Sequence, residues 1–278
     1  MTITTAEAPV QARTSTRPRR TKGRGGGGQA LRTIGLYAVA IVVGLGVWQL
    51  LAVKYGPSLV ASPSQTLSAA RELAADGTLG NSVIASSRRI LIGWGLGVLV
   101  GTPVGLLIGQ IRIVRLLLEP YTEFFRFIPP VAFVTLAVVW LGIGESSKVV
   151  LIFYTAVFIV TLNTSAGVMA VSESKLRAAA SLGASRRQIL QRVVLPSTVP
   201  YILTGARLAM GNSFLTIVSA EIVAAQVGLG SLIWTSRNYG RIDWVFVGII
   251  TLGILGLVYD RILRVIAMRV LYKYGAKV

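Results

Sequence analysis

The sequence predicts an all-α membrane protein with six transmembrane helices. Hydrophobic residues make up 53% of its 278 residues and charged residues only 14%, a composition too apolar for a water-soluble domain. Several uncharged stretches approach the roughly 20 residues that a helix needs to cross about 30 Å of hydrocarbon. The chain contains neither Cys nor His, which excludes disulfides, His/Cys zinc sites, thiol nucleophiles and Ser-His-Asp triads.

Six stretches are the predicted spans. In chain order they are residues 34–53, 90–111, 127–144, 149–171, 200–222 and 244–259. The fifth and sixth give the weakest signal. Arg207 and Glu221 lie inside the fifth, and Asp243 and Asp260 bracket the sixth.

The segments on either side of the first span are predicted to lie outside the membrane. Residues 1–30 are mostly Thr, Ala, Arg and Gly, which is typical of a disordered, basic arm, and the transmembrane domain is expected over residues 31–275. Residues 63–80 predict a short surface helix. The apolar positions at helical spacing in that helix are Leu67, Ala70, Leu73 and Ala74.

The charge distribution predicts the orientation of the chain. Lys and Arg number 28 against 10 Asp and Glu, and basic residues collect in cytoplasmic loops. When both termini are placed in the cytoplasm, most of the basic residues fall in the inside segments. The basic excess is therefore explained by topology in a plasma membrane, and a nucleic-acid partner is not expected.

Glycines and prolines within the spans predict close packing and broken helices. A glycine at every fourth position of the second span forms a smooth ridge for another backbone; the ridge comprises Gly93, Gly97, Gly101, Gly105 and Gly109. Packing within one chain is the favoured interpretation, and a subunit interface is the alternative. Pro103 lies in the same span, and Pro129 and Pro130 break the third, which indicates either a translocation path or a kink without function.

Polar residues at membrane depth are candidates for a translocation path. The candidates are Arg126, Pro129, Asn163, Asn212, Ser213 and Glu221. The alternative for Arg126 is a structural pair with Glu119 or Glu123, and the alternative for the two Asn residues is hydrogen bonding between helices.

A charged loop over residues 172–198 predicts an amphipathic helix-turn-helix on the cytoplasmic face. Leu176, Ala179 and Ala180 share one helical face, residues 182–184 form a bend, and a second apolar stretch ends at Leu195 and Pro196. The bend offers an apolar knob edged by Arg186 and Arg187, which suits docking into a groove of a soluble partner. The alternative is a helix lying on anionic lipid.

This loop resembles the EAA loop of permease subunits of binding-protein-dependent ABC importers. The matching positions are Arg177-Ala178-Ala179, Gly183 and Leu195-Pro196, with Arg177 where the family usually has Glu. The flanking segments resemble the nitrate, sulfonate and taurine group of these permeases. They are residues 126–130, 140–148, 220–221 and 228–230, together with Asp243 and Asp260.

The resemblance implies the fold and assembly of a type I importer. Such a machine contains two permease copies in a lipid bilayer, here a homodimer, two cytoplasmic ATP-binding subunits and an extracytoplasmic solute-binding protein. The implied coupling positions are Arg177, Ala178, Ala179, Ser181, Leu182, Gly183, Ala184 and Arg187. The implied solute is a small anion such as a sulfonate, taurine or nitrate, although relatives also carry a pyrimidine vitamin precursor.

The chain itself is not expected to be an enzyme. It has no Gly-x-x-x-x-Gly-Lys-[Ser/Thr] loop, so ATP and Mg are expected in the partner ATPase, and no cofactor or metal is expected in this chain. An ion-coupled secondary transporter and a membrane-embedded enzyme are the competing hypotheses. The scattered acidic residues show no convincing catalytic pairing.

Overall fold

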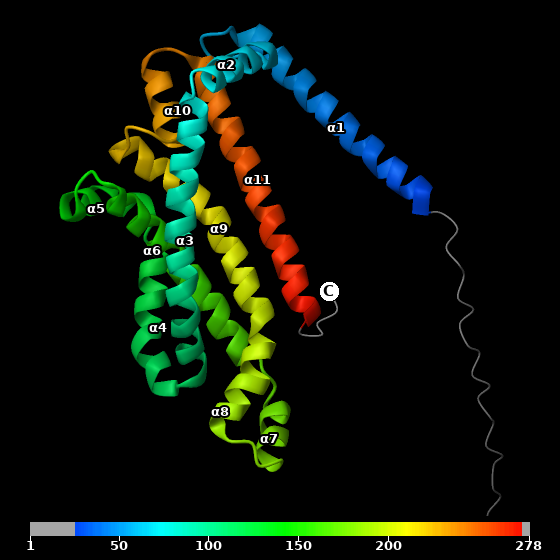
Figure 1. Ribbon diagram of the computed structural model, residues 1–278, viewed down its shortest axis with the longest axis vertical. Helices are drawn as coiled ribbons and strands as arrows, with labels where there is room; N and C mark the ends of the chain where they lie inside the picture. The colour runs from blue at the N-terminus through cyan, green and yellow to red at the C-terminus, as the bar shows by residue number, and fades with distance from the viewer. Residues whose placement is uncertain (1–25, 274–278) are drawn as a thin grey trace, which may run out of the picture. The chain divides into compact units, whose positions relative to one another are not determined.

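The computed structural model describes residues 26–273, and all regular structure within that range is helical (Figure 1). The chain divides into two units between Val47 and Trp48. Helix α1 (Gly26–Tyr55) begins within the range that the sequence assigns to the N-terminal arm. The rest of that arm, residues 1–25, lies outside the described residues.

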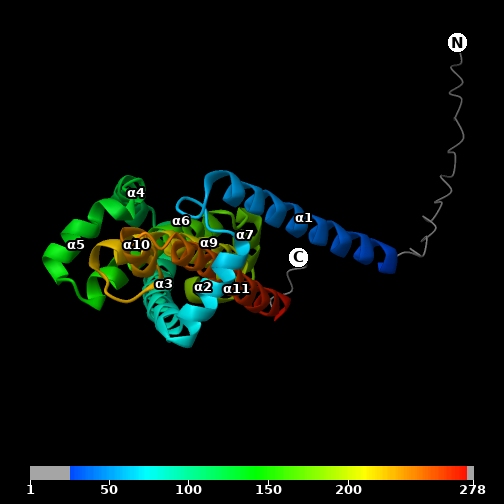
Figure 2. The same cartoon turned by 90° about the horizontal axis from the view of Figure 1, so that it is seen from above.

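Within the described residues, α1 is long and apolar enough to cross a membrane over Arg32–Tyr55, and so are four further helices. They are α3 (Thr78–Gln110), α6 (Glu145–Met169), α9 (Leu195–Ala224) and α11 (Ile242–Lys273). Helix α6 packs against both α3 and α9. Viewed from above, α4 and α5 lie on one side of this group and α11 on the other (Figure 2). The predicted spans at 90–111, 149–171, 200–222 and 244–259 lie largely within these helices.

The predicted third span, residues 127–144, is wrong as a single helix. The chain forms α4 (Arg112–Arg126), a 3₁₀ turn η1 (Pro130–Phe133) and α5 (Val134–Leu141), with a bend of 90° between α4 and the η1–α5 segment. Pro129 and Pro130 lack the N–H that a helix needs and force an extended backbone before them. Helix α5 alone rises only about 12 Å. Six spans result when the bent pair is counted as one.

The predicted surface helix is present as α2 (Pro63–Ala75), which ends before residue 80, and its buried face only partly matches the predicted apolar positions. Ser62 caps it in a capping box with Gln65. Thr66, Ala69 and Leu73 are buried, whereas Leu67 is 55% exposed. Helix α2 packs on α11 and α3, and Ala69 and Leu73 join an apolar cluster with α10 (Leu229–Asn238) and α11. These neighbours decide the buried face, and they are not encoded in the spacing within α2.

The 172–198 loop folds as a helix-turn-helix, as predicted, but its second helix does not end at Leu195 and Pro196. Helix α7 (Glu173–Ser181) is followed by α8 (Arg186–Ile189), the π-helical turn η2 (Leu190–Val194) and α9. The last three form one continuous helical stretch of 39 residues, Arg186–Ala224. The widened turn η2 precedes Pro196, which cannot donate the usual hydrogen bond four residues back.

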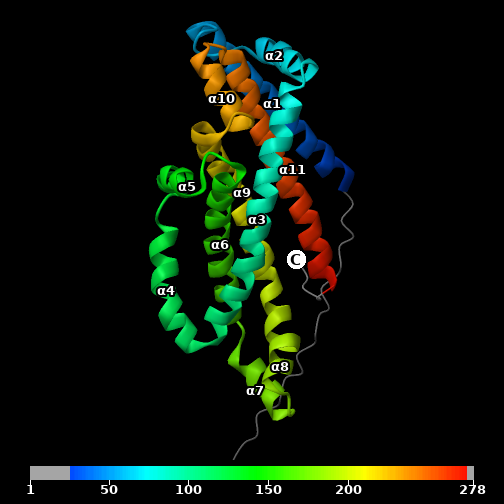
Figure 3. The ribbon, with the colours of Figure 1, turned by 60° about the vertical axis from the view of Figure 1, so that its left-hand side comes forward.

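The helix-turn-helix and the pair α2 and α10 lie at opposite ends of the unit that begins at Trp48 (Figures 1 and 3). We refer to these as the α7–α8 end and the α2–α10 end. Figure 3 shows α4 running alongside α6 from the lower part of the helical group, with α5 turning away.

The five ridge glycines of α3 lie against α6 of the same chain. A Cβ added at Gly97 would come within 2.4 Å of Ala156 Cβ, and one added at Gly105 within 2.5 Å of the Thr161 carbonyl oxygen. Real side chains do not approach so closely, so these two backbones pack at a distance that only glycine permits. By contrast, Gly95 has nothing within 4 Å of its added Cβ.

We expect Gly97→Ala to lower the free energy of unfolding by about 1–3 kcal/mol, because an extra methyl group overpacks the α3–α6 contact. The matched control is Gly95→Ala, two residues away on the open side of α3. Thermal unfolding of the detergent-purified variants measures both. Equal melting temperatures for the two variants would contradict the packing assignment.

Candidate functional site

The turn between α7 and α8 presents Leu182 to solvent, with 89% of its surface exposed. The N–H of Ala184 donates to the Ala179 carbonyl at 3.1 Å, and the N–H of Gly183 donates to the Ala180 carbonyl at 2.9 Å. These are the two hydrogen bonds of a Schellman motif, with Gly183 at a φ of +80°. Leu182 is therefore held outward by a fixed backbone.

The second half of this turn is fixed as well. Ser185 caps α8 in a capping box with Gln188. Most of the predicted coupling positions are exposed, and they are Arg177, Ala178, Ser181, Leu182, Gly183 and Arg187; Ala179 and Ala184 are half-buried. The guanidinium of Arg177, which replaces the usual Glu, pairs with Glu173 one turn earlier at 2.8 Å.

A buried carboxylate lies near the α2–α10 end. Glu221 of α9 has no exposed surface. Its carboxylate accepts hydrogen bonds from Ser86 Oγ at 2.7 Å, from Arg89 Nη1 at 2.7 Å and from the Gly230 N–H at 2.8 Å. The Gly228 backbone lies so close that an added Cβ would be 2.4 Å from Glu221 Cδ.

Arg89 extends this interaction to α6. Its Nε and Nη2 donate to Glu145 at 2.8 and 2.7 Å, and its Nη1 also donates to the Val227 carbonyl at 2.7 Å. The buried Lys148 ammonium lies 3.5 Å from Glu145. Arg89, Glu145, Lys148 and Glu221 are here called the charge cluster. Arg89, Lys148 and Glu221 are buried, whereas Glu145 is exposed and also lies 3.5 Å from Arg88. Each buried charge of the cluster thus has a partner of opposite charge.

The predicted path residues fall into different environments. Glu221 is enclosed and holds helices together. Ser213 is buried and Asn163 is half-buried, and each donates to a carbonyl of its own helix. Asn212 is exposed and donates to the Leu208 carbonyl at 2.9 Å. Within residues 26–273, the two Asn side chains therefore do not form the hydrogen bonds between helices that the alternative interpretation predicts.

Arg126 and Pro129 are exposed at the broken helix. Arg126 pairs with Glu123 at 3.6 Å, not with Glu119, and stacks over Phe127. The Tyr154 hydroxyl donates to the Phe125 carbonyl. Because Tyr154 lies near the middle of α6, Arg126 lies at a similar depth.

Charged residues follow one face of α4. They recur every three or four positions and are Arg112, Arg115, Glu119, Glu123 and Arg126. This spacing places them on one stripe of the helix. Charged side chains at membrane depth face water or protein rather than lipid, so this stripe requires water or protein against it wherever it lies within the membrane.

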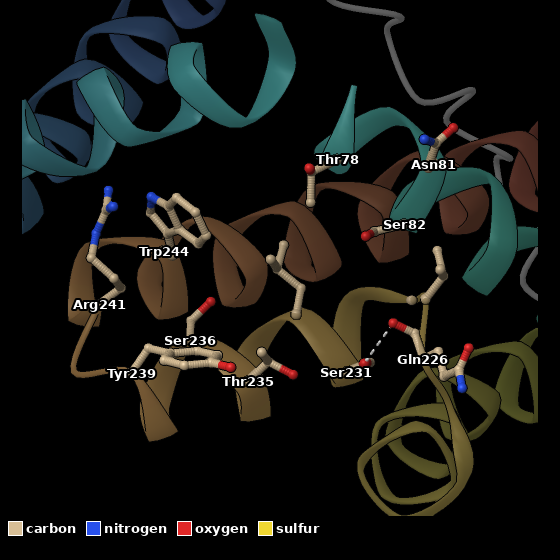
Figure 4. Close-up of a pocket in the computed structure, with 13 residues that line it drawn as sticks. Thr78, Asn81, Ser82, Gln226, Ser231, Thr235, Ser236, Tyr239, Arg241 and Trp244 are labelled. Atoms are coloured by element: carbon tan, nitrogen blue, oxygen red, sulfur yellow. Dashed lines mark hydrogen bonds between the residues drawn. The ribbon is translucent and has the colours of Figure 1, made fainter. Parts of the chain in front are cut away.

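A cavity of about 510 Å³ opens at the α2–α10 end, between the start of α3, the α9–α10 connection, α10 and the start of α11 (Figure 4). Hydroxyl groups, one guanidinium and two aromatic rings line it together with Val227 and Leu232. Arg241 at its rim donates to Asp243 and Glu72 and stacks over Trp244. Both hydrogen bonds raise the pKa of Arg241 above its ordinary value, and the bond that Asp243 accepts has the larger effect.

Sequence reasoning missed both this cavity and Arg89. Arg89 lies one residue before the predicted second span, 90–111, and from sequence it is only a basic residue of the loop that precedes this span. The available signal is Glu221, an acidic residue in an otherwise apolar span, because a carboxylate at that depth requires a cationic partner. Within residues 26–273, no group of three or more acidic side chains is arranged to hold a metal ion.

The arrangement of apolar helices defines a multi-pass membrane protein. The family model described as the inner membrane component of binding-protein-dependent transport systems matches residues 101–272. The chain belongs to this family, and it is a permease subunit of an ABC importer.

Relatives match over most of the chain. A probable ABC transporter permease protein of Brucella melitensis is 41% identical over 84% of this chain and 95% of its own length. The taurine transport system permease protein TauC of Escherichia coli is 36% identical over 89% of this chain and 91% of its own length. The nitrate import permease protein NrtB of Synechocystis is 35% identical over 81% of this chain and 84% of its own length.

The fold matches a solved importer. A chain of the methionine ABC transporter MetNI in an inward-facing conformation superposes with a TM-score of 0.58. The match covers 71% of this chain and 96% of that chain at 21% sequence identity. It establishes the fold of a type I importer permease.

We expect Glu221→Gln to lower the free energy of unfolding by about 3–5 kcal/mol, because it leaves Arg89 short of a buried charged partner. The matched control is Glu119→Gln, the same change at an exposed position of α4. Thermal unfolding of the purified variants tests this. A melting temperature for Glu221→Gln equal to that of the control would show that the charge cluster contributes little.

Proposed function

We propose that this permease subunit takes its energy from a separate cytoplasmic ATP-binding subunit that docks on the α7–α8 turn. The observation that carries the proposal is the exposed Leu182 on a rigid turn. An apolar side chain held away from the rest of its own chain is the kind of feature that inserts into a groove of a partner. Arg186 and Arg187 flank it and suit a groove with an acidic rim.

The basic residues at the α7–α8 end also indicate how the chain is oriented in the membrane. The α7–α8 end carries the basic residues of the 172–198 loop, which is typical of cytoplasmic segments. We therefore place this end and both termini in the cytoplasm, and the α2–α10 end outside. The solute-binding protein then docks at the α2–α10 end.

The proposed assembly has two copies of this chain and two ATP-binding subunits. ATP and Mg bind in the partner, since this chain lacks a phosphate-binding loop. The charged stripe of α4 supports a homodimer with a polar route, because either a second copy or water must cover Arg126 and Glu123 at membrane depth.

The proposed solute is a small anion such as a sulfonate, taurine or nitrate. Support comes from the names of the relatives, which describe taurine and nitrate transport. Arg126 and Asn212 are the exposed polar candidates along the path. A vitamin precursor or another small organic solute is the alternative for the same importer class.

Purification of the tagged chain from its native membranes in mild detergent tests the energy source. We expect an ATP-binding subunit to co-elute at near-equal stoichiometry. A chain that elutes alone and still takes up solute in liposomes without ATP would instead establish an ion-coupled secondary transporter.

We expect Leu182→Arg to abolish ATP-driven uptake while leaving membrane insertion intact, because a charge replaces the docking side chain. The matched control is Ile113→Arg, an aliphatic-to-arginine change at an exposed site at the start of α4, outside the 172–198 loop. Uptake in cells is normalised to the amount of each variant in the membrane. Normal uptake by Leu182→Arg would refute docking at this turn.

We expect Glu119→Cys to react with a membrane-impermeant thiol reagent at least several times faster than Leu117→Cys. Both residues are exposed on α4, but only Glu119 lies on the charged stripe. The natural chain has no Cys, so each variant carries a single thiol. Equal labelling rates in inside-out vesicles would contradict a water-filled route along the stripe.

A further inference from the structure

We propose that the cavity at the α2–α10 end is a binding site on the permease itself for a small organic anion, such as an alkyl sulfonate. The proposal rests on the proposed orientation, which places the cavity where solute arrives. The proposed site lies within a single chain. It is separate from the charged stripe of α4 and from Asn163 and Asn212.

The dimensions and walls of the cavity suit a small organic molecule. Its volume of about 510 Å³ lies within the range of pockets that bind such ligands. Val227, Leu232 and the Trp244 ring give it apolar surface. An apolar body of a few carbon atoms is needed to cover these groups, and an inorganic oxyanion lacks one.

An unpartnered hydroxyl group points to the polar part of the ligand. Ser236 is only 1% exposed, and its Oγ has no hydrogen-bond partner in the described part of the chain. Buried hydroxyl groups in proteins are almost always hydrogen-bonded. Figure 4 shows Ser236 and Thr235 on the α10 side of the cavity, with Thr78 and Ser82 of α3 opposite.

The lining offers an oxyanion a guanidinium edge and no carboxylate. Arg241 is the charged residue among those that line the cavity, which include neither Asp nor Glu. Its Nε and Nη2 are held by Asp243 and Glu72, whereas no hydrogen bond is formed by its Nη1 within residues 26–273. The site thus offers hydroxyl donors and one guanidinium edge to an oxyanion.

The cavity is preformed because the charge cluster holds one of its walls. Val227 accepts from Arg89, the Leu229 N–H donates to Ser86 Oγ at 2.9 Å, and the Gly230 N–H donates to Glu221. The α9–α10 connection and the start of α10 are therefore fixed before any ligand arrives. A ligand then binds without first ordering this wall.

Equilibrium dialysis tests the site directly. The permease is purified with its accompanying subunits into nanodiscs, without solute-binding protein, and radiolabelled ethanesulfonate and nitrate are the probes. We expect saturable binding of ethanesulfonate at one site per chain and at least tenfold weaker binding of nitrate.

Two variants assign the binding to this cavity. Thr235→Trp fills the cavity from an exposed wall position, and we expect it to abolish ethanesulfonate binding, while Asn238→Trp on α10 outside the lining binds as the natural chain does. Ser236→Ala should weaken binding about fivefold, the effect of one lost hydrogen bond. Its melting temperature should not fall, because the Ser236 hydroxyl has no partner among the described residues.

Three outcomes would overturn the proposal. They are absence of saturable ethanesulfonate binding, unchanged binding in both Thr235→Trp and Ser236→Ala, and occupation of the cavity by the solute-binding protein. The last outcome is detected by the rate at which a thiol reagent modifies the single Cys of Thr235→Cys. Ligand-free solute-binding protein would slow this modification, whereas ethanesulfonate would not. None of these readouts depends on ATP, so failure of the site is distinguishable from failure of the ATP-driven function.

Discussion

A carboxylate buried in an apolar span constrains much of this structure. The Glu221 carboxylate is buried without solvent, so several donors must converge on it. They come from α3 and the start of α10. Arg89, one of these donors, must itself be satisfied, which draws in Glu145 of α6 and the Val227 carbonyl. The hydrogen-bonding needs of two side chains therefore tie α3, α6, α9 and the α9–α10 connection together at this level of the molecule.

Helix α9 connects the two parts of the molecule for which a function is proposed. With α8 and η2 it forms a continuous stretch of 39 residues from Arg186 to Ala224, which spans roughly 58 Å at 1.5 Å per residue. One end of this stretch follows the exposed turn at Leu182, and the other carries Glu221 beside the wall of the cavity. A rotation imposed at the turn would thus be carried by one continuous helical stretch to the groups that shape the cavity.

Local features of this chain were predictable from sequence, and long-range contacts were not. The helix-turn-helix was predictable because Gly183, Ser185 and the spacing of Leu176 and Ala179 act within a few residues. The bend at Pro129 was visible as a break, but the charges of α4 made that helix look like a loop. Arg89 was missed because its partner lies 132 residues further along the chain. The cavity was missed for the same reason, since its lining comes from α3, α10 and α11.

The glycine ridge of α3 limits how this protein can change shape. At Gly93, Gly97 and Gly101 the two backbones interlock with no space for a methyl group, so sliding of α3 along α6 would force carbonyl groups and side chains into one another. These two helices must consequently move as a rigid body. Any change in the shape of the unit therefore has to take place at other joints, such as the bend between α4 and α5 or the contact between α9 and α11.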